Sequence, residues 1–326
     1  MMKFWMSSMA QQMLAVMNAG RPKCDDTQSG PKLKKQLVVV IMGATGTGKS
    51  RLSIDLATTF PAEVINSDKM QVYRGLDIVT NKISEEERRG VPHHLLGSFN
   101  PTSEFTAQNF CDIASLAVDS ISSRGLLPII VGGSNSYIEA LVDNEELNFK
   151  AKYDCCFLWV DVAMPVLHKF VSHRVDQMVD KGMVDEARVM FDPHADYTRG
   201  IRKSIGIPEL DMYLRTEHSL DEASKEKLLH ESISSMKLNT CKLAIRQLEK
   251  ILRLRNAKSW NIHRIDATEV FLKSGEEADK AWENSVAKRS ILIVKKALYG
   301  MNTNAKTPSS SLRTCREYNN VTECYV

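Results

Sequence analysis

A glycine-rich segment near the start of the chain has the composition needed to bind phosphate groups. It fits the pattern G-x-x-x-x-G-K-[ST] and reads Gly43-Ala44-Thr45-Gly46-Thr47-Gly48-Lys49-Ser50. Glycines allow such a loop to curl so that backbone N–H groups point inward, and a following helix adds its positive N-terminal dipole end. Lys49 supplies a mobile positive charge, and the Ser50 hydroxyl could hold a Mg²⁺ ion that bridges phosphate oxygens. The segment predicts a site for a di- or triphosphate without identifying the compound.

Two aspartates are candidates to act beside this loop. A carboxylate at Asp68 could accept a proton from an attacking nucleophile or coordinate a metal ion, and its alternative role is to stabilise the turn Ser67-Asp68-Lys69. Asp161 follows the apolar residues 157–160, and the segment 157–161 resembles the Mg²⁺-binding Walker B strand of ATPases. Asp161 could equally have no metal-binding role and merely end its strand or cap the next helix. Val162 stands where many ATPases place a catalytic glutamate. An ATPase, a small-molecule kinase and an enzyme acting on another diphosphate all remain open at this point.

Alternating strands and helices are predicted around these residues. Strands buried on both faces are indicated by short apolar runs, and helices by amphipathic periodicity. The predicted strands are 37–42, 62–66, 126–131 and 155–160, and the helices 51–60, 105–123 and 137–142. This alternation implies parallel βαβ units, so we expect an α/β fold with a doubly wound parallel sheet of P-loop type. Asp68 follows the second strand, at the edge where open sheets bind ligands, and should therefore face the loop across the crevice.

The second half of the chain is predicted to be mainly helical. Long amphipathic patterns cover 166–191, 219–256 and 276–297, which favours an appended helical subdomain. Residues 299–326 are rich in Ser, Thr and Asn and are expected to be disordered. The expected organisation is an N-terminal extension (1–36), a P-loop α/β core (37–163), a helical subdomain with part of the core (164–298) and a tail (299–326).

Composition and charge exclude several classes of protein. Apolar residues make up 43% of the 326 residues and charged ones 25%, as in soluble globular domains. The sequence contains no run of about eighteen apolar residues, which is the length that a membrane-spanning helix needs. Seven cysteines without a C-x-x-C pair argue against a disulfide scaffold or a zinc ribbon. Residues 1–35 carry a net charge of +4 and the other 291 a net charge of −1. We therefore expect neither a membrane nor a nucleic acid as a partner.

Several segments, in a fixed order, resemble the dimethylallyl (isopentenyl) transferases that prenylate N6 of adenine. The resemblance covers roughly residues 37–256, and its middle motifs are more specific than the phosphate loop. Besides Thr45, it rests on Asn66-Ser67-Asp68-Lys69-Met70-Gln71-Val72-Tyr73-Arg74-Gly75-Leu76-Asp77-Ile78, Val91-Pro92-His93-His94-Leu95-Leu96, Val131-Gly132-Gly133-Ser134-Asn135-Ser136-Tyr137, Arg174-Val175-Asp176-Gln177-Met178 with Gly182 and Glu186, Lys203-Ser204-Ile205-Gly206, and Arg246-Gln247-Leu248.

One branch of this family modifies tRNA, and another modifies free adenine nucleotides to begin cytokinin synthesis. Only 36 residues separate Tyr137 from Arg174, where the tRNA branch usually inserts a helical segment. Cys315 and Cys324 have no histidine after them, so the zinc finger of many eukaryotic tRNA enzymes is missing. The stretches 43–56 and 239–244 look like plant adenylate isopentenyltransferases in particular. The alternatives are a tRNA dimethylallyltransferase, a P-loop small-molecule kinase and a non-catalytic nucleotide-binding module.

The resemblance implies that the loop holds the diphosphate of dimethylallyl diphosphate. Lys49, the loop N–H groups and Mg²⁺ at Ser50 would stabilise the charge of the leaving diphosphate. Thr45 would contact the bridging region of the leaving group, and Arg174 would reach the same diphosphate. The alternative for Arg174 is a surface ion pair with Asp176 or Asp180.

For the acceptor, the resemblance implies that Asp68 takes a proton from the adenine N6 amine and that Ser67 helps to fix the base. Three cations recur along the predicted helix 219–256 and would favour ADP and ATP over AMP, namely Lys237, Lys242 and Arg246. Lys242 and Arg246 share a face and Lys237 is displaced from it, so a solvated helix face is the alternative.

The first 24 residues contain no acid and several Met and Ser residues, which is typical of an organelle transit peptide. With the resemblance to plant enzymes, this composition predicts a plastid location. The alternative is a disordered extension of a cytoplasmic protein.

Overall fold

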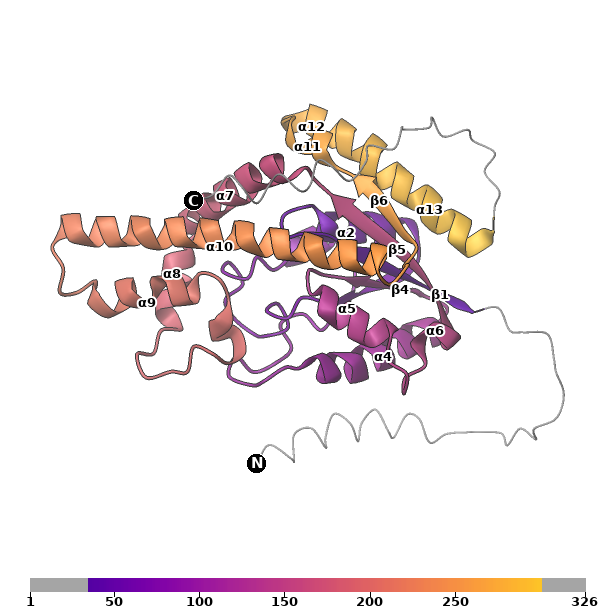
Figure 1. The fold of residues 1–326 in the computed structure, drawn as a ribbon, viewed down its shortest axis with the longest axis horizontal. Helices are drawn as coiled ribbons and strands as arrows, with labels where there is room; N and C mark the ends of the chain where they lie inside the picture. Colours follow the sequence, from indigo (N-terminus) through magenta and orange to yellow (C-terminus); the bar gives the residue numbers. More distant parts are fainter. Residues whose placement is uncertain (1–34, 301–326) are drawn as a thin grey trace. The chain divides into compact units, whose positions relative to one another are not determined.

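A six-stranded parallel sheet organises the chain. In the computed structural model (Figure 1), which describes residues 35–300, its strands lie in the order β3-β2-β4-β1-β5-β6. They are β1 (Gln36–Met42), β2 (Ala62–Asn66), β3 (His93–His94), β4 (Leu127–Val131), β5 (Tyr153–Asp161) and β6 (Ile262–Asp266). The expected parallel α/β sheet is thus confirmed. Apart from a few residues, the predicted extension 1–36 and tail 299–326 lie outside the described residues.

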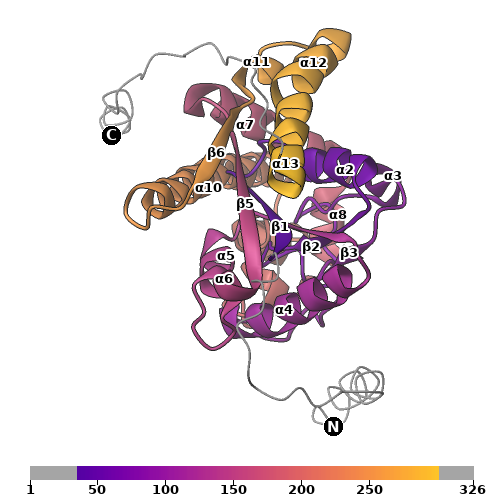
Figure 2. The same cartoon turned by 90° about the vertical axis from the view of Figure 1, so that its right-hand side faces the viewer.

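Helices cover both faces of the sheet. Figure 2 shows α2 (Lys49–Thr59) and α13 (Lys288–Tyr299) on one face, and α4 (Ala107–Ser123), α5 (Asn135–Val142) and α6 (Phe149–Lys152) on the other. The central strands are buried between these layers, and residues 38–42 of β1 are fully inaccessible to solvent. A strand buried on both sides requires a continuous apolar run, and this run is what allowed β1 to be predicted from the sequence.

The register of the sheet aligns three strand ends at one edge. Ile41 of β1 pairs with Val131 of β4, which also pairs with Asn66 of β2. The segments that follow these residues are the glycine-rich loop, the turn Ser67-Asp68 and the pair Gly132-Gly133. Because the strands are parallel, all three segments leave the sheet at the same edge, which is where open sheets bind ligands.

The structure differs from the sequence prediction in two additional strands and in one helix that is divided into two. Strands β3 and β6 were not predicted, since β3 has two residues and the sequence of β6, Ile-His-Arg-Ile-Asp, has no continuous apolar run. Strand β6 pairs with β5, so the chain returns to the sheet after its long helices. The predicted helix 166–191 is two helices, α7 (Met164–Asp180) and α8 (Met183–Val189), because Gly182 between them has φ +93°.

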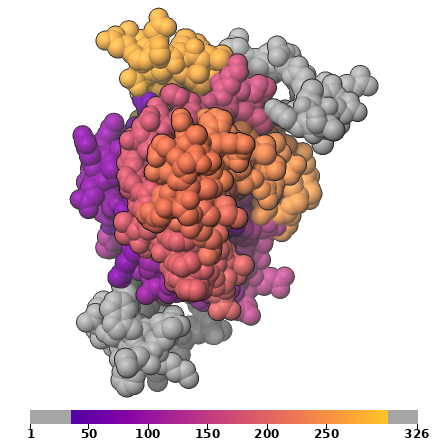
Figure 3. All heavy atoms as spheres, turned by 90° about the vertical axis from the view of Figure 1, so that its left-hand side faces the viewer, coloured from indigo at the N-terminus to yellow at the C-terminus, as the bar shows by residue number. Residues whose placement is uncertain are grey.

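The helical part forms a block beside the sheet. Helix α10 (Glu222–Asn256) packs on α7 and on α9 (Ile207–Thr216), and its other end reaches α5. Figure 3 views the outer end of this block, where atoms of α9 and α10 face the viewer. The remaining helices are short: α3 (Glu85–Arg88), a 3₁₀ turn (Gly200–Lys203), α11 (Thr268–Phe271) and α12 (Gly275–Trp282), which continues through a π-helical turn (Glu283–Ala287) into α13. Within residues 35–300, none of the helices has the length and apolarity to cross a membrane.

Candidate active site

The glycine-rich loop is enclosed by neighbouring elements. Gly48 caps the start of α2 with φ +90°, and a Cβ atom there would lie 2.6 Å from the indole of Trp282. On the opposite side, a Cβ atom at Gly46 would lie 2.6 Å from Val171 of α7. Only glycine combines the left-handed backbone with so close an approach, so the loop is fitted between α7 and the end of α12.

Lys49 points back over the loop. Its Nζ donates to the carbonyl oxygen of Ala44 at 2.6 Å, and the Thr47 hydroxyl donates to the same oxygen at 3.0 Å. Burial lowers the pKa of Lys49 to about 8, the charge of Asp68 opposes this effect, and the charge of Arg174 adds to it. Lys49 is therefore near Asp68 and Arg174, the charged residues to which the family resemblance gives roles in the transfer.

Arg174 reaches the loop from α7. Its Nη2 donates to the Thr45 hydroxyl at 2.9 Å, and its buried Nε has no hydrogen-bond partner in residues 35–300. Burial lowers the pKa of Arg174 to about 10. The alternative ion pair with Asp176 is not formed, since Asp176 accepts from Lys237 at 2.6 Å. Within the described residues, this guanidinium thus keeps an unused N–H donor beside the glycine-rich loop, and such a donor can bind an oxygen of an anion.

The two carboxylate oxygens of Asp68 differ. Oδ1 accepts from the backbone N–H of Met70 at 2.9 Å and of Gln71 at 3.4 Å. Oδ2 accepts no hydrogen bond in the described part of the chain, and a Cβ atom on Gly133 would lie 3.6 Å from it. The turn role and the reactive role are therefore compatible, because one oxygen fixes the turn and the other is left to accept a proton.

Ser67 is buried beside Asp68. Its Oγ has no hydrogen-bond partner among residues 35–300, while its backbone N–H donates to Val131 at 2.7 Å and its carbonyl accepts from Ser134 at 3.1 Å. A Cβ atom on Gly132 would lie 2.3 Å from the Ser67 carbonyl. The glycine pair after β4 thus allows the Ser67-Asp68 backbone to pass close beside it.

The predicted cations of α10 are divided by the structure. Lys237 is neutralised by Asp176, whereas Lys242 and Arg246 have no acidic partner in the described ranges and share a face with Lys250, each four residues from the next.

Arg246 and Lys250 belong to a larger group of cations. After burial, which is the main cause, Lys203, Lys250 and Arg246 each lower the pKa of Lys69, and Asp68 opposes them. We call Lys69, Lys203, Arg246 and Lys250 the basic cluster. Lys69, Lys203 and Lys250 were not predicted as site residues, although Lys203 begins the motif Lys203-Ser204-Ile205-Gly206 and Lys250 continues the spacing of Lys242 and Arg246.

Asp161 is a poor candidate for a metal ligand because it is paired with Arg264. Its Oδ2 accepts from Nε of Arg264 on β6 at 2.6 Å, and its side chain is almost fully buried. Burial raises the pKa of Asp161, and Arg264 opposes this effect. Within residues 35–300, no three His, Cys, Asp or Glu side chains come together as a metal site. The candidate ligand that remains is the exposed hydroxyl of Ser50, which suits Mg²⁺ that takes its other ligands from water and a diphosphate.

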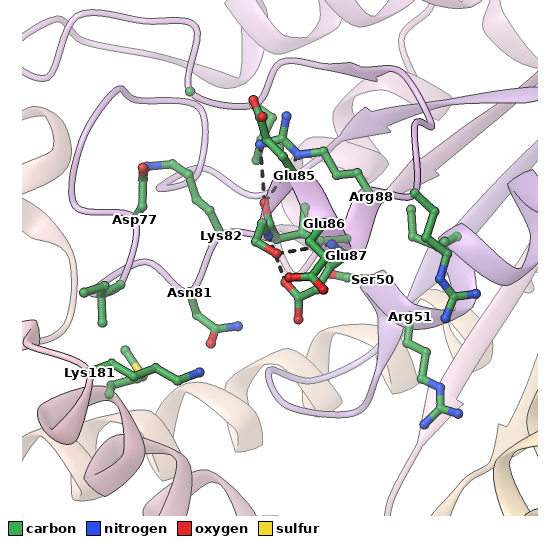
Figure 4. A pocket seen from close by; sticks show the side chains of 18 of the residues that line it. Ser50, Arg51, Asp77, Asn81, Lys82, Glu85, Glu86, Glu87, Arg88 and Lys181 are labelled. Atoms are coloured by element: carbon green, nitrogen blue, oxygen red, sulfur yellow. Dashed lines mark hydrogen bonds and ion pairs between the residues drawn. The ribbon is translucent and has the colours of Figure 1, made fainter. Parts of the chain in front are cut away.

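A cavity of about 1070 Å³ opens next to the loop. Ser50 and Arg174 line it, together with charged residues of both signs that include Arg51, Arg74, Lys82, Glu85 and Lys181. Figure 4 shows Asn81 and Lys181 across the cavity from Arg51. The capped start of α3 at Ser84 forms part of its wall, with Ser84 N–H donating to Glu87 at 2.8 Å and Glu87 N–H donating to the Ser84 hydroxyl at 3.2 Å.

Known proteins are similar to this chain in sequence and in fold. The family model IPP transferase matches residues 71–151 and 143–251. Adenylate isopentenyltransferase 5, chloroplastic, of Arabidopsis thaliana is 61% identical over 268 residues, which is 81% of each chain. Adenylate isopentenyltransferase 3, chloroplastic, of the same plant is 60% identical over 261 residues, covering 79% of this chain and 77% of the relative. A crystal structure of a eukaryotic dimethylallyltransferase acting on tRNA has a TM-score of 0.69 at 25% identity, covering 83% of this chain and 81% of the other.

Proposed function

Since the chain belongs to the IPP transferase family, and within it to the adenylate isopentenyltransferases, we propose that it transfers the dimethylallyl group of dimethylallyl diphosphate to N6 of a free adenine nucleotide. The C1–O bond of the donor breaks, the N6–C1 bond forms, diphosphate leaves, and N6 loses one proton. This transfer is the first step of cytokinin biosynthesis. The observation that carries the proposal is the convergence of a phosphate loop, the cation Arg174 and the carboxylate Asp68 around Lys49.

The loop side of the site binds the donor. Cleavage of the allylic C1–O bond places positive charge on carbon and negative charge on the diphosphate. Lys49 and Arg174, whose Nε–H has no partner among residues 35–300, bring positive charge to the loop where the negative charge develops, and such fixed charges usually give the largest catalytic contribution. Thr45, held by Arg174, contacts the bridging region of the leaving group.

Magnesium fits the same region through Ser50. The hydroxyl of Ser50 lies in the first turn of α2, is exposed, and lines the cavity beside Arg174. When bound, Mg²⁺ would supply further neutralisation of the leaving diphosphate.

Asp68 acts on the acceptor. The N6 lone pair of adenine is delocalised into the ring, so a carboxylate that orients the amine and accepts its proton assists the attack. Oδ2 takes this role because Oδ1 is already bound by two backbone N–H groups. The buried hydroxyl of Ser67 is available to hydrogen-bond the base.

The basic cluster gives the acceptor site its preference for ADP and ATP. Lys69 follows Asp68 directly, so Lys203, Arg246 and Lys250 gather their charge next to the place where the nucleotide is bound. A di- or triphosphate tail gains more from such clustered cations than the single phosphate of AMP. Lys242 can add to this effect from the same face of α10, whereas Lys237 is occupied by Asp176.

The protein acts in the plastid. The Arabidopsis relatives named above are both chloroplastic by name. The predicted transit segment lies outside the described residues.

Product analysis tests the proposal. Purified protein is incubated with dimethylallyl diphosphate, Mg²⁺ and, separately, AMP, ADP, ATP or tRNA, and products are identified by mass. We expect N6-prenylated ADP and ATP with release of diphosphate. Prenylated tRNA alone would support the tRNA-modifying alternative, and ADP formed from ATP with a phosphorylated product would support a kinase.

The acceptor preference is tested with single variants. Lys250→Ala should raise KM for ADP about tenfold, as expected for the loss of one charge contact, and should raise KM for AMP much less. Lys237→Ala is the matched control on the same helix, and its KM for ADP should stay unchanged. An equal effect of both variants would contradict the role of the basic cluster.

A further inference from the structure

The side-chain amide of Gln247 connects the two halves of the site. Gln247 lies on α10 and is 7% exposed. Its Oε1 accepts from the backbone N–H of Thr45 at 2.7 Å, and its Nε2 donates to the carbonyl oxygen of Gly133 at 3.0 Å. Thr45 belongs to the phosphate loop, and Gly133 follows β4 beside Asp68. One amide therefore spans the gap between the donor side and the acceptor side.

The surroundings fit an amide closely. A Cβ atom on Gly133 would lie 2.3 Å from the Gln247 Nε2, so this position requires glycine to leave room for the amide. The buried side chain of Asn135 donates to the backbone carbonyl of Gln247 at 3.1 Å and ties α10 to α5 at the same place. The side-chain amide of Gln247 thus uses both its donor and its acceptor, and the backbone carbonyl of Gln247 is bound as well. Because this site is nearly solvent-free, loss of one of these hydrogen bonds would leave a buried polar group unpaired.

Thr45 is held from two helices at once. Gln247 of α10 binds its backbone N–H, and Arg174 of α7 binds its hydroxyl. Because the Thr45 N–H is bound by Gln247 and its hydroxyl by Arg174, the loop is fixed in position at this residue.

We propose that Gln247 is a positioning residue that sets the separation between the donor-binding loop and Asp68. The inference rests on the proposed function, since only a two-substrate transfer needs this separation to be fixed. An amide is the group required, because it accepts at one end and donates at the other, which neither a carboxylate nor an apolar side chain of the same size can do. A small displacement of one reactant from the other lowers the rate without abolishing binding of either.

The test compares Gln247→Glu with the wild-type protein across pH. At neutral pH the carboxylate still accepts from Thr45 but cannot donate to Gly133, so kcat should fall about 10–100-fold with KM for both substrates within a few-fold. When the new carboxyl group is protonated at lower pH, it can donate again, and kcat relative to wild type should recover. Arg174, Lys49 and Asp68 also carry charge near this position, so Gln247→Glu and wild type are compared at each pH in the same buffer.

A control and a second variant complete the design. Gln108→Glu, on the exposed face of α4, should leave kcat and its pH profile unchanged. Gln247→Met removes both hydrogen bonds at similar volume and should lower kcat at every pH, so it carries the test if Gln247→Glu does not fold. A pH-independent ratio for a folded Gln247→Glu protein, or an unchanged kcat for Gln247→Met, overturns the inference. Absence of any prenylated nucleotide from the wild-type protein is a different result and overturns the proposed function instead.

Discussion

Arg174 donates from Nη2 to the hydroxyl of Thr45 at 2.9 Å, which links α7 to the glycine-rich loop across 129 residues of sequence. The contact holds beside the loop a guanidinium whose Nε has no partner within the described part of the chain, and this is where we propose that the diphosphate binds. It also fixes the threonine that lies between the first two glycines of the loop. Loop and helix are therefore joined at the proposed donor site, although the phosphate-binding motif contains only the loop.

Replacement of this guanidinium should be costly even by another cation. In Arg174→Lys, one ammonium cannot bind Thr45 and two diphosphate oxygens in the same geometry. We expect kcat/KM for dimethylallyl diphosphate to fall about 10²-fold, as when one fixed donor to a developing charge is removed. Steady-state kinetics with varied donor measure the effect, and Arg215→Lys, in an exposed ion pair on α9, is the control. Wild-type kinetics of Arg174→Lys would show that the arginine has no role at the diphosphate.

Asp68→Asn should separate proton acceptance from the turn. The amide oxygen can still accept from the N–H groups of Met70 and Gln71, so the turn should persist. The amide cannot take the N6 proton, and kcat should fall by about 10²–10⁴-fold, with KM for the donor nearly unchanged. Single-turnover formation of the prenylated nucleotide provides the measurement, with Asp112→Asn on α4 as a surface control. A rate within a few-fold of wild type would exclude Asp68 as the base.

The sequence was sufficient for those parts of the site that depend on local patterns. The glycine loop and Asp68 follow the first and second predicted strands, so their position at one edge of the sheet followed from parallel topology alone. Arg174 could be placed only through the family resemblance.

Other parts depend on contacts between distant segments. The bond from Gln247 to Thr45 spans 202 residues. Lys203 lies close enough to Lys69 to lower its pKa because the chain folds back on itself. The periodicity of a single helix or strand does not predict such a long-range approach. Strand β6 was missed because His263 and Arg264 interrupt its apolar pattern, and the partner of Lys237 was missed because Asp176 lies on a different helix.

Lys49 should give the reaction an alkaline limit. Its pKa is lowered to about 8, so the charged form is present below this pH and is lost as the pH rises through it. Because the charge is needed to bind the diphosphate, kcat/KM for the donor should fall about tenfold per unit above pH 8. Lys49→Arg keeps its charge in this range and should lack that limit, although its activity at pH 7 should be lower. Ionisation of the donor is common to both proteins, so identical alkaline limits would argue against Lys49 as the titrating group.

The contact between Gly48 and Trp282 should be visible in stability. In Gly48→Ala, the new methyl group lies 2.6 Å from the indole on a backbone with φ +90°, so we expect a loss of about 2–4 kcal/mol in the free energy of unfolding. Gly125→Ala is the matched control, since its φ is +72° but no atom lies within 4 Å of the added carbon. It should cost only about 1–2 kcal/mol of backbone strain. Urea unfolding measures both, and equal losses would mean that Trp282 does not restrict the loop.

Glu63 should make the fold sensitive to acid. It is 6% exposed and accepts from Nη1 and Nη2 of Arg124 at 2.5 and 2.8 Å and from Nε2 of His94 at 2.7 Å. The hydrogen bonds from Arg124 are the main cause that lowers the pKa of Glu63 to about 2. Since this pKa lies below the ordinary value of 4.5, the stabilisation is fully present above pH 4.5 and is lost as the pH falls from there toward 2.

The size and the test of this effect follow from its surroundings. Because Arg124 is partly exposed to screening solvent, we expect Glu63 to contribute about 1–2 kcal/mol, less than the full pKa shift implies. Urea unfolding at pH 6 and pH 3 should show a larger loss of stability for the wild-type protein than for Glu63→Gln, which has no proton to gain at this position. Glu85→Gln, on the exposed face of α3, is the control and should lose as much as wild type. If Glu63→Gln also lost as much, acid sensitivity would have to come from other carboxylates, because an uncharged side chain at position 63 cannot take up the proton that weakens the fold.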